Sequence, residues 1–200
     1  MEKQVKKYAG MYREAIQRRG LTDVEGKTRA YEEKLTQLYG SEAYRTHNVY
    51  PTMQVEKVYA VIAMCLMLKS YGLDNDDIIN TVNDAFRKLK AALYRLEKLV
   101  DRLPVTWAIV KKWNTADHQG RTGDGSIAYD FFKVEEDKIS YRISRCMYAE
   151  MFQFYGIREL CKIFCMTDTQ AYDHLTRHVK FVRHSDLSNG DCCWDEIIKL

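Results

Sequence analysis

The stretch IAYDFFKVEEDKISYRISRC, residues 127–146, decides the fold class. It holds two runs rich in β-branched and aromatic residues, 127–134 and 138–144, on either side of the turn EEDK. Two such runs around a short polar turn predict a β-hairpin. The C-terminal stretch VKFVRHSDLSNGDCCWDEIIKL predicts a second hairpin, with strands at 179–184 and 191–198 around Ser-Asn-Gly.

The rest of the chain has helical patterns. Between the hairpins, MYAEMFQFYG and IRELCKIFC predict two helices, and a third is expected to begin after Thr167, whose spacing to Gln170 fits a capping box. Upstream, apolar residues recur at steps of three and four in 55–68 and again in 74–103. The second of these segments predicts a buried seam of Ile78, Val82, Phe86, Leu89, Leu93, Leu96 and Val100.

These elements predict an α+β fold. A helical region, residues 1–113, is expected to pack on a C-terminal unit, residues 127–200, in which two β-hairpins form an antiparallel sheet with intervening helices. Residues 114–126 are dense in Gly, Asp, Asn and Thr and predict a flexible loop between the two, within one compact domain overall.

The composition narrows the class of protein. Apolar residues make up 46% and charged residues 30% of the chain, as in an ordinary soluble globular protein. A net charge of +3, without a basic stripe interleaved with aromatics, argues against a nucleic-acid partner. The longest apolar run, 59–68, is about half the length of a membrane span, which argues against a membrane partner. We therefore expect a cytoplasmic protein whose six cysteines are reduced thiols.

Most of these cysteines lie near the C-terminus, and Cys146 is the first candidate for chemistry. It sits where the second predicted strand meets a helix, with Ser144 as the expected N-cap, so the helix dipole should lower the pKa of its thiol. Glu150 lies four residues later on the same helical face. The pair suits a nucleophile with an acid/base, two metal ligands, or a buried cysteine beside a solvated glutamate.

Cys161 and Cys165 are also four residues apart, and Asp168 follows. Two thiols on one helical face could ligate zinc, whose structural sites favour Cys and His, but small thiols also pack readily in cores. Arg183, inside the apolar run VKFVRH, needs an anionic partner, either an internal carboxylate or a carboxylate substrate.

Together, CMYAEMFQFYGIRELCKIFCMTD and VKFVRHSDLSNGDCC resemble the L-2-amino-thiazoline-4-carboxylic acid hydrolase family. The resemblance rests on short elements in the family's order: Cys146 with Tyr148, Gly156 with Glu159 and Leu160, Cys165 with Asp168, Arg183, and Gly190 with Cys193. Many members follow the last cysteine with Asp-Phe. Here Trp194 and Asp195 follow it. Asp195 is therefore one residue later than the family's Asp, and we expect it on the opposite face of the strand from that position.

The resemblance implies a hydrolase that acts on a carbon–nitrogen bond of a small cyclic amidine carboxylate. Cys146, Cys165, Asp168 and Cys193 would surround one cleft, with Cys193 facing the pocket and Cys192 spare. Glu150 is a further catalytic candidate. Arg183 and Tyr148 are the expected substrate-binding residues.

Two mechanisms and one rival class stay open. In the first mechanism, the Cys146 thiolate attacks the amidine carbon while Asp168 or Glu150 transfers protons. In the second, Cys146, Cys165 and Cys193 hold a divalent metal such as zinc, which activates water. The rival is a non-catalytic module that binds a small ligand or a metal and acts as a sensor or partner subunit.

Overall fold

The computed structural model describes residues 2–200 and divides the chain into two compact units, Met1–Leu89 and Lys90–Leu200. The predicted boundary at residue 113 therefore falls inside the second unit. All six cysteines are free thiols. Among the described residues, no helix is both long and apolar enough to cross a membrane.

The first unit is entirely helical. It consists of α1 (Glu2–Arg18), α2 (Val24–Tyr39), α3 (Glu42–His47), α4 (Thr52–Ser70) and α5 (Asn75–Leu89). Helix α4 is apolar all round and supplies the centre of the core, where the Tyr31 hydroxyl donates to the Ala60 carbonyl at 3.1 Å. Gly72, with φ +83°, follows the end of α4 as predicted.

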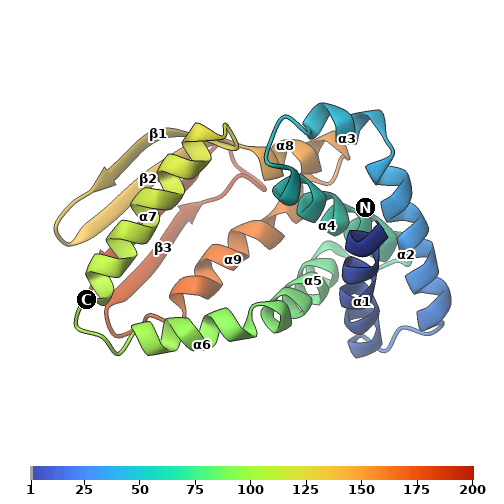
Figure 1. Ribbon diagram of the computed structural model, residues 1–200, viewed down its shortest axis with the longest axis horizontal. Helices are drawn as coiled ribbons and strands as arrows, with labels where there is room; N and C mark the ends of the chain where they lie inside the picture. The colour runs from blue at the N-terminus through green and yellow to red at the C-terminus, as the bar shows by residue number, and fades with distance from the viewer. Residues whose placement is uncertain (1) are drawn as a thin grey trace. The chain divides into compact units, whose positions relative to one another are not determined.

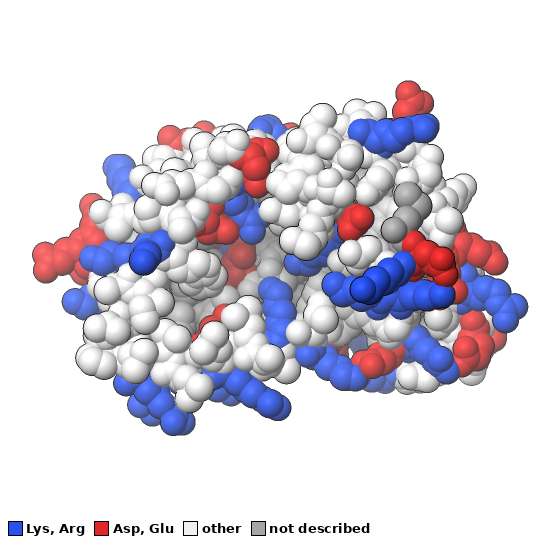
Figure 2. All heavy atoms as spheres, in the orientation of Figure 1, with Lys and Arg blue, Asp and Glu red and all other residues white. Residues whose placement is uncertain are grey.

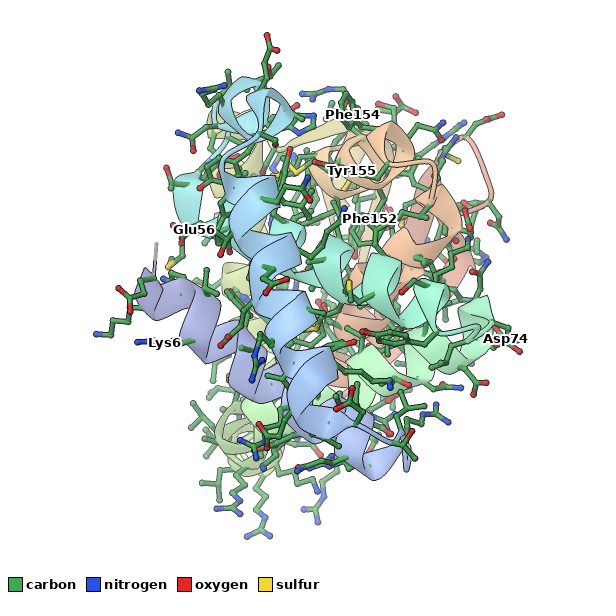
Figure 3. All side chains as sticks on the ribbon, turned by 90° about the vertical axis from the view of Figure 1, so that its right-hand side faces the viewer. Lys6, Glu56, Asp74, Phe152, Phe154 and Tyr155 are labelled. Carbon is green, nitrogen blue, oxygen red and sulfur yellow. The ribbon has the colours of Figure 1, made fainter. Side chains whose placement is uncertain are left out.

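In Figure 3, Lys6 points outward from α1. Asp74 lies just before α5 and accepts a hydrogen bond from the Asp77 backbone N–H at 2.8 Å.

The second unit carries the sheet. Its helices are α6 (Ala91–Val100), α7 (Thr106–Gly123), α8 (Met147–Phe154), the short 3₁₀ helix η1 (Arg158–Cys161) and α9 (Lys162–Tyr172). Its strands are β1 (Ile127–Val134), β2 (Lys138–Cys146), β3 (Val179–Ser185) and β4 (Cys193–Lys199). The fold class is therefore α+β, as the sequence predicted.

Both predicted hairpins are confirmed, and they join into one antiparallel sheet with the strand order β1-β2-β4-β3. Helix α7 lies along the sheet and α9 runs beside β3 (Figure 1). Side chains from these two helices, from the segment after α9 and from the covered face of the sheet form one core: Trp107, Val110, Ile139, Tyr172, Leu175, Val179 and Ile197. The covered face extends beyond this core to Phe181 and Tyr141, which are partly buried.

Three expectations about the helices are wrong. Residues 114–123 are not a flexible loop but the second half of α7, because their side chains are held by distant parts of the chain. Asn114 accepts a hydrogen bond from the Tyr172 hydroxyl at 2.9 Å, and the His118 ring stacks on Phe132 with centroids 4.1 Å apart. These tertiary contacts outweigh the turn propensity of Gly120 and Gly123.

The expected seam of residues 78–100 is also broken. Helix α5 ends at Leu89 and α6 begins at Ala91, with Lys90 outside the helical region at φ −93°, ψ 3°. Ile78, Val82 and Phe86 are buried as predicted, but Leu89, Leu93 and Leu96 are exposed because the helical phase is not continuous.

The helix expected after Thr167 does not begin there. Helix α9 runs without interruption from Lys162, and the Thr167 hydroxyl donates to the Phe164 carbonyl at 2.8 Å inside that helix. The hydroxyl therefore binds the preceding turn instead of capping a new helix.

The apolar contact between α7, α9 and the sheet should dominate the stability of the second unit. Ile197 lies on a central strand at 0% exposure, so Ile197→Ala should lower the free energy of unfolding by about 2–5 kcal/mol. Val134→Ala, at an exposed position of β1, should change it by no more than about 0.5 kcal/mol. Urea unfolding followed by circular dichroism measures both. An equal effect of the two substitutions would contradict this account of the core.

Candidate functional site

A buried ion pair joins the two strands of the second hairpin. Arg183 of β3 lies directly opposite Asp195 of β4. The guanidinium donates from Nε to Asp195 Oδ1 at 2.8 Å and from Nη2 to Asp195 Oδ2 at 2.7 Å. The Asp195 side chain is only 1% exposed. Such a bidentate pair gives both carboxylate oxygens a hydrogen bond and fixes the orientation of the guanidinium.

The remaining donors of Arg183 reach helix α9. Its Nη1 donates to the Cys165 carbonyl at 2.5 Å, and its Nη2 lies 3.3 Å from Asp168 Oδ2. Burial opposes the charge of Arg183, but Asp195, with smaller effects of Cys193 and Asp168, outweighs burial and raises the pKa of the guanidinium. Of the two partners considered from sequence, the structure thus provides the internal carboxylate. Binding of a substrate carboxylate by Arg183 stays a prediction.

Asp195 lies next to two of the candidate site residues, Cys193 and Arg183. Alternation along β4 places it on the same face as Cys193, with exposed Trp194 between them on the other face. The Cys193 thiol donates to Asp195 Oδ2 at 3.4 Å, and burial, with the Asp195 charge, raises the pKa of that thiol. Cys193 therefore faces inward as expected. Cys192 precedes the strand, and its sulfur lies 3.6 Å from the Ser185 hydroxyl.

Helix α9 brings Cys165 and Asp168 to this face. About half of the Asp168 side chain, 54%, is accessible to water. Burial by the surrounding protein nevertheless raises its pKa, and the Asp195 charge acts in the same direction, while Arg183 opposes them. A carboxyl group that is reachable from solvent and has a raised pKa suits a proton carrier. Cys161, the last residue of η1, is buried, and a hydrogen bond with Cys165 together with burial raises the pKa of its thiol.

Cys146 ends β2 and occupies the N-cap position of α8, in place of the expected Ser144. The backbone N–H groups of Tyr148 and Ala149 act to lower the pKa of its thiol, as a helix N-terminus should. Burial is the larger effect, however, and raises this pKa to about 12. The expectation of a lowered pKa is therefore wrong, because the dipole of a two-turn helix does not compensate for desolvation.

Glu150 does not join Cys146 as the spacing suggested. Its carboxylate forms a salt bridge of 3.5 Å with Arg145, and both side chains are partly exposed. Its catalytic role stays a prediction. Tyr148, by contrast, lies in the site: its ring stacks on Phe164 with centroids 4.5 Å apart, and its hydroxyl accepts from Arg121 Nη1 at 3.0 Å.

Arg121 is a site residue that the sequence reasoning missed. It lies on α7, where Nε also donates to Asp117 at 3.1 Å. Its positive charge acts on the pKa values of both Cys146 and Asp168, so it lies within electrostatic reach of both. The spacing of Asp117 and Arg121, four residues apart, fits a helical ion pair. That signal was hidden because the segment was interpreted as a loop.

The surface of the second unit is hollowed over α9, between α6 and α7 (Figure 2). Acidic and basic side chains are visible inside the hollow. Tyr129 and Tyr148 each lie within electrostatic reach of both Cys146 and Asp168, which places the thiol and the carboxylate in one region. The structure thus brings together Cys146, Cys165, Asp168, Arg183, Cys193 and Tyr148 from the predicted set.

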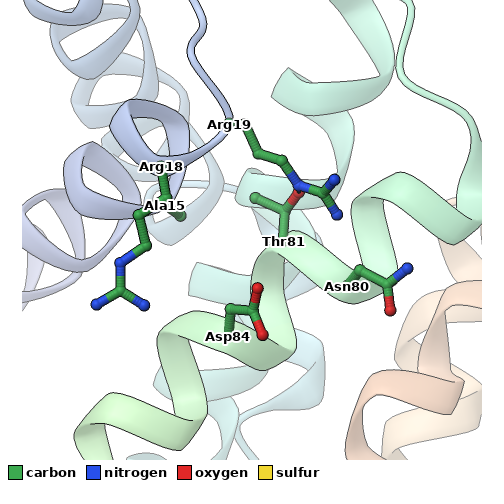
Figure 4. Close-up of a pocket in the computed structure, with 6 residues that line it drawn as sticks. All are labelled: Ala15, Arg18, Arg19, Asn80, Thr81 and Asp84. Carbon is green, nitrogen blue, oxygen red and sulfur yellow. The ribbon is translucent and has the colours of Figure 1, made fainter.

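A separate depression of about 320 Å³ lies in the first unit (Figure 4). It is lined by Ala15, Arg18, Arg19, Asn80, Thr81 and Asp84. Arg19 is bound to Thr81 at 2.8 Å and to Asp77 at 3.2 Å. None of the predicted site residues lines this depression.

The predicted metal site does not fit the observed donors. Within residues 2–200, no group of three or more His, Cys, Asp or Glu side chains is arranged to hold a metal ion. Cys193 is turned toward Asp195, while Cys161 and Cys165 face each other. A mechanism through Cys146, Cys165 and Cys193 as joint ligands therefore has no support in this geometry.

The fold and the site define an α+β protein whose thiols and carboxyl groups meet on the helix-covered face of an antiparallel sheet. The sequence profile of the L-2-amino-thiazoline-4-carboxylic acid hydrolase family matches residues 52–195. This match covers well over half of the chain, which therefore belongs to that family. No curated protein and no solved structure matches the chain.

Removing one partner of the Arg183–Asp195 pair should be strongly destabilising. Asp195→Ala leaves a buried guanidinium without its carboxylate, and we expect a loss of about 3–5 kcal/mol in the free energy of unfolding. Asp130→Ala is the matched control, because Asp130 pairs with Arg142 at 3.2 Å in an exposed position and should contribute at most about 1 kcal/mol. Urea unfolding measures the free energy of unfolding of both variants. Similar losses in the two would contradict this interpretation of the Arg183–Asp195 pair.

The Cys146 thiol should react slowly with iodoacetamide in the folded protein. A pKa raised from 9.0 to about 12 reduces the thiolate fraction near neutral pH about a thousandfold. In urea this protection should disappear. Peptide mass spectrometry after timed alkylation measures it, with the half-buried Cys192 as an internal comparison. Rapid alkylation of Cys146 without urea would show that the thiol is already activated.

Proposed function

We propose that this protein hydrolyses a carbon–nitrogen bond of a small cyclic amidine carboxylate of the kind that names its family. Cys146 is the nucleophile and Asp168 the proton carrier. The observation that carries the proposal is the position of Cys146 at a strand-to-helix junction, with two backbone N–H groups acting on its sulfur, in the region of a solvent-accessible carboxyl group with a raised pKa. A nucleophile and an acid/base within one concave region are the minimum for such chemistry.

The reaction begins with addition. The Cys146 sulfur forms a bond to the amidine carbon, and its proton passes to Asp168. The ring carbon–nitrogen bond then breaks, and the departing nitrogen takes the proton from Asp168. Water adds to the same carbon, the carbon–sulfur bond breaks, and the thiol is restored. The net change is the addition of one water molecule across the carbon–nitrogen bond.

The high pKa of the Cys146 thiol is compatible with this sequence because an amidine binds as a cation. A positive charge beside the sulfur favours the thiolate, so substrate binding itself activates the nucleophile. Tyr148, which lies beside Cys146 and stacks on Phe164, offers a flat apolar wall to a small ring. The hydrogen bond from Arg121 fixes the orientation of its hydroxyl.

In this scheme Arg183 positions the proton carrier. Its Nη2 lies 3.3 Å from Asp168 Oδ2 and 2.7 Å from Asp195 Oδ2, so one guanidinium links the two carboxylates. Asp195, buried and fully engaged by Arg183 and Cys193, acts as its support. Direct contact of Arg183 with the substrate remains the expectation from sequence.

The second candidate is a non-catalytic module that binds the same class of small ligand. The observation in its favour is that burial keeps the Cys146 thiol neutral in the absence of ligand. Such a module would be stabilised by the ligand and would not consume it. A thermal shift with 2-amino-thiazoline-4-carboxylate, without loss of the compound over many hours, would favour this candidate.

Substitution of the proposed nucleophile tests the enzyme. Cys146→Ser should reduce consumption of 2-amino-thiazoline-4-carboxylate below detection, because a neutral hydroxyl is a much poorer nucleophile than a thiolate. Asp168→Asn should lower kcat about 10²–10⁴-fold, the usual contribution of a positioned acid/base. Chromatography with mass detection follows the substrate, and intact-protein mass spectrometry looks for the adduct on Cys146.

Cys192→Ser is the matched control, since Cys192 lies in the loop before β4 and plays no part in the scheme. It should keep the activity of the unaltered protein. Full activity of Cys146→Ser would remove Cys146 as the nucleophile. No consumption by the unaltered protein of any cyclic amidine carboxylate would overturn the proposed function.

A further inference from the structure

Helix α6 has its polar side buried and its apolar side exposed. Leu93, Leu96 and Leu99 are 48%, 56% and 56% exposed, whereas the buried residues are Tyr94 and Glu97. A surface helix normally turns its leucines toward the core. The inward residues, Lys90, Tyr94, Glu97 and Asp101, recur at the spacing of one helical face. Polar side chains turned inward on a surface helix suggest that the space between α6 and its neighbours binds a polar group.

Two of the polar groups at this face have no partner. Among residues 2–200, the buried atoms without a hydrogen bond in the second unit are Glu97 Oε2 and Gln170 Nε2. Both residues are more than nine-tenths buried, at 8% and 5% exposure. The Tyr94 hydroxyl donates to Gln170 Oε1 at 3.1 Å, which leaves the amide nitrogen as the free end. Buried polar atoms in this state are destabilising and are rare in native structures, so each calls for an explanation.

Lys90 adds an unpaired cation. Its ammonium forms no hydrogen bond or salt bridge with any of residues 2–200, yet burial lowers its pKa, and Asp168 and Glu97 lie within electrostatic reach. Burial also raises the pKa of Glu97 to about 7, against the opposing effect of Lys90. Glu97 is therefore about half protonated near pH 7, and in its protonated form it can donate a hydrogen bond.

We propose that Lys90, Glu97 and Gln170 form a subsite that binds the carboxylate of the small molecule whose amidine end faces Cys146 and Asp168. The inference rests on the proposed function for the identity of the amidine end. The subsite replaces Arg183 as the carboxylate anchor, because the Arg183 guanidinium already binds Asp195, Asp168 and the Cys165 carbonyl. Three donors that lack acceptors call for a ligand group with several acceptor atoms and a negative charge. A carboxylate meets this need, and a doubly charged phosphate fits less well because the Asp168 carboxyl group lies within electrostatic reach of Lys90.

The subsite adjoins the proposed chemistry through Asp168. The charge of Asp168 acts to raise the pKa of Lys90, and Asp168 also contacts Arg183 at 3.3 Å. The anion subsite and the proton carrier therefore belong to one region. A ligand with a carboxylate at one end and a cationic amidine at the other would place opposite charges against Lys90 and Asp168. This arrangement orients the ring and gives a half-buried lysine without an internal partner a role.

Binding of a planar, unreactive analogue tests the subsite. The probes are 2-aminothiazole-4-carboxylate and the corresponding 4-carboxamide, which differ in the charge of one group. Lys90→Met should weaken carboxylate binding about ten- to a hundredfold and leave carboxamide binding within about twofold. Gln170→Leu should weaken the carboxylate about tenfold. Titration calorimetry measures all affinities.

Lys98→Met is the matched control, because Lys98 is an exposed lysine on the same helix. It should leave both affinities unchanged. Melting temperatures show whether each variant folds, and Lys90→Gln replaces Lys90→Met if the latter does not. Equal weakening of both probes by Lys90→Met, or no preference of the unaltered protein for the carboxylate, would overturn the subsite.

Turnover measured on the unaltered protein separates the two proposals. Charge-selective binding that depends on Lys90, without hydrolysis of any cyclic amidine carboxylate, would support the subsite and reject the enzyme. Hydrolysis with a KM that is unchanged in Lys90→Met would support the enzyme and reject the subsite.

Discussion

The buried pair between Arg183 and Asp195 is the interaction on which the organisation of the second unit depends. It connects β3 to β4 through two parallel hydrogen bonds, and the same guanidinium reaches α9 through the Cys165 carbonyl and Asp168. A planar group with five donors can bind both oxygens of a carboxylate on β4 and still donate to acceptors on α9, whereas an ammonium makes only a point contact with a carboxylate. One side chain thereby sets the position of the helix that carries the candidate proton carrier.

The same burial that makes this pair specific keeps the neighbouring thiols neutral. Desolvation raises the pKa of both Cys146 and Cys193 and exceeds the effect of the helix N-terminus at Cys146. Without a ligand, the thiols of such a site are almost entirely protonated and react slowly. In the proposed reaction the charge that ionises the nucleophile comes with the substrate, so binding and activation are one event.

Helix α6 conflicts with the general rule that apolar residues are buried. Its exposed leucines and its buried Glu97 reduce stability, and the hydrogen bonds that would offset the buried side are incomplete. Local conflicts of this kind concentrate at functional sites, where part of the folding stability is given up for a preorganised surface. The surface in this case faces α9, where Gln170 accepts a hydrogen bond from the Tyr94 hydroxyl at 3.1 Å.

The sequence by itself determined the four strands, their pairing into two hairpins and the α+β class, because a strand's alternation and a short turn are local properties. It also pointed to Cys146, Cys165, Asp168, Arg183 and Cys193, since these residue types recur in the family's order. Local patterns misled where contacts are distant. Residues 114–123 are helical because Asn114 and Arg121 bind Tyr172 and Tyr148, far along the chain.

Only the tertiary structure decided which groups face one another and how much water reaches them. It gave Arg183 an internal partner and reversed the expected direction of the Cys146 pKa shift. It also buried Glu97 and Gln170 without complete hydrogen bonding and left Lys90 half-buried beside them. Desolvation and long-range pairing depend on the packing of elements separated by tens of residues, so no spacing in the sequence could express them.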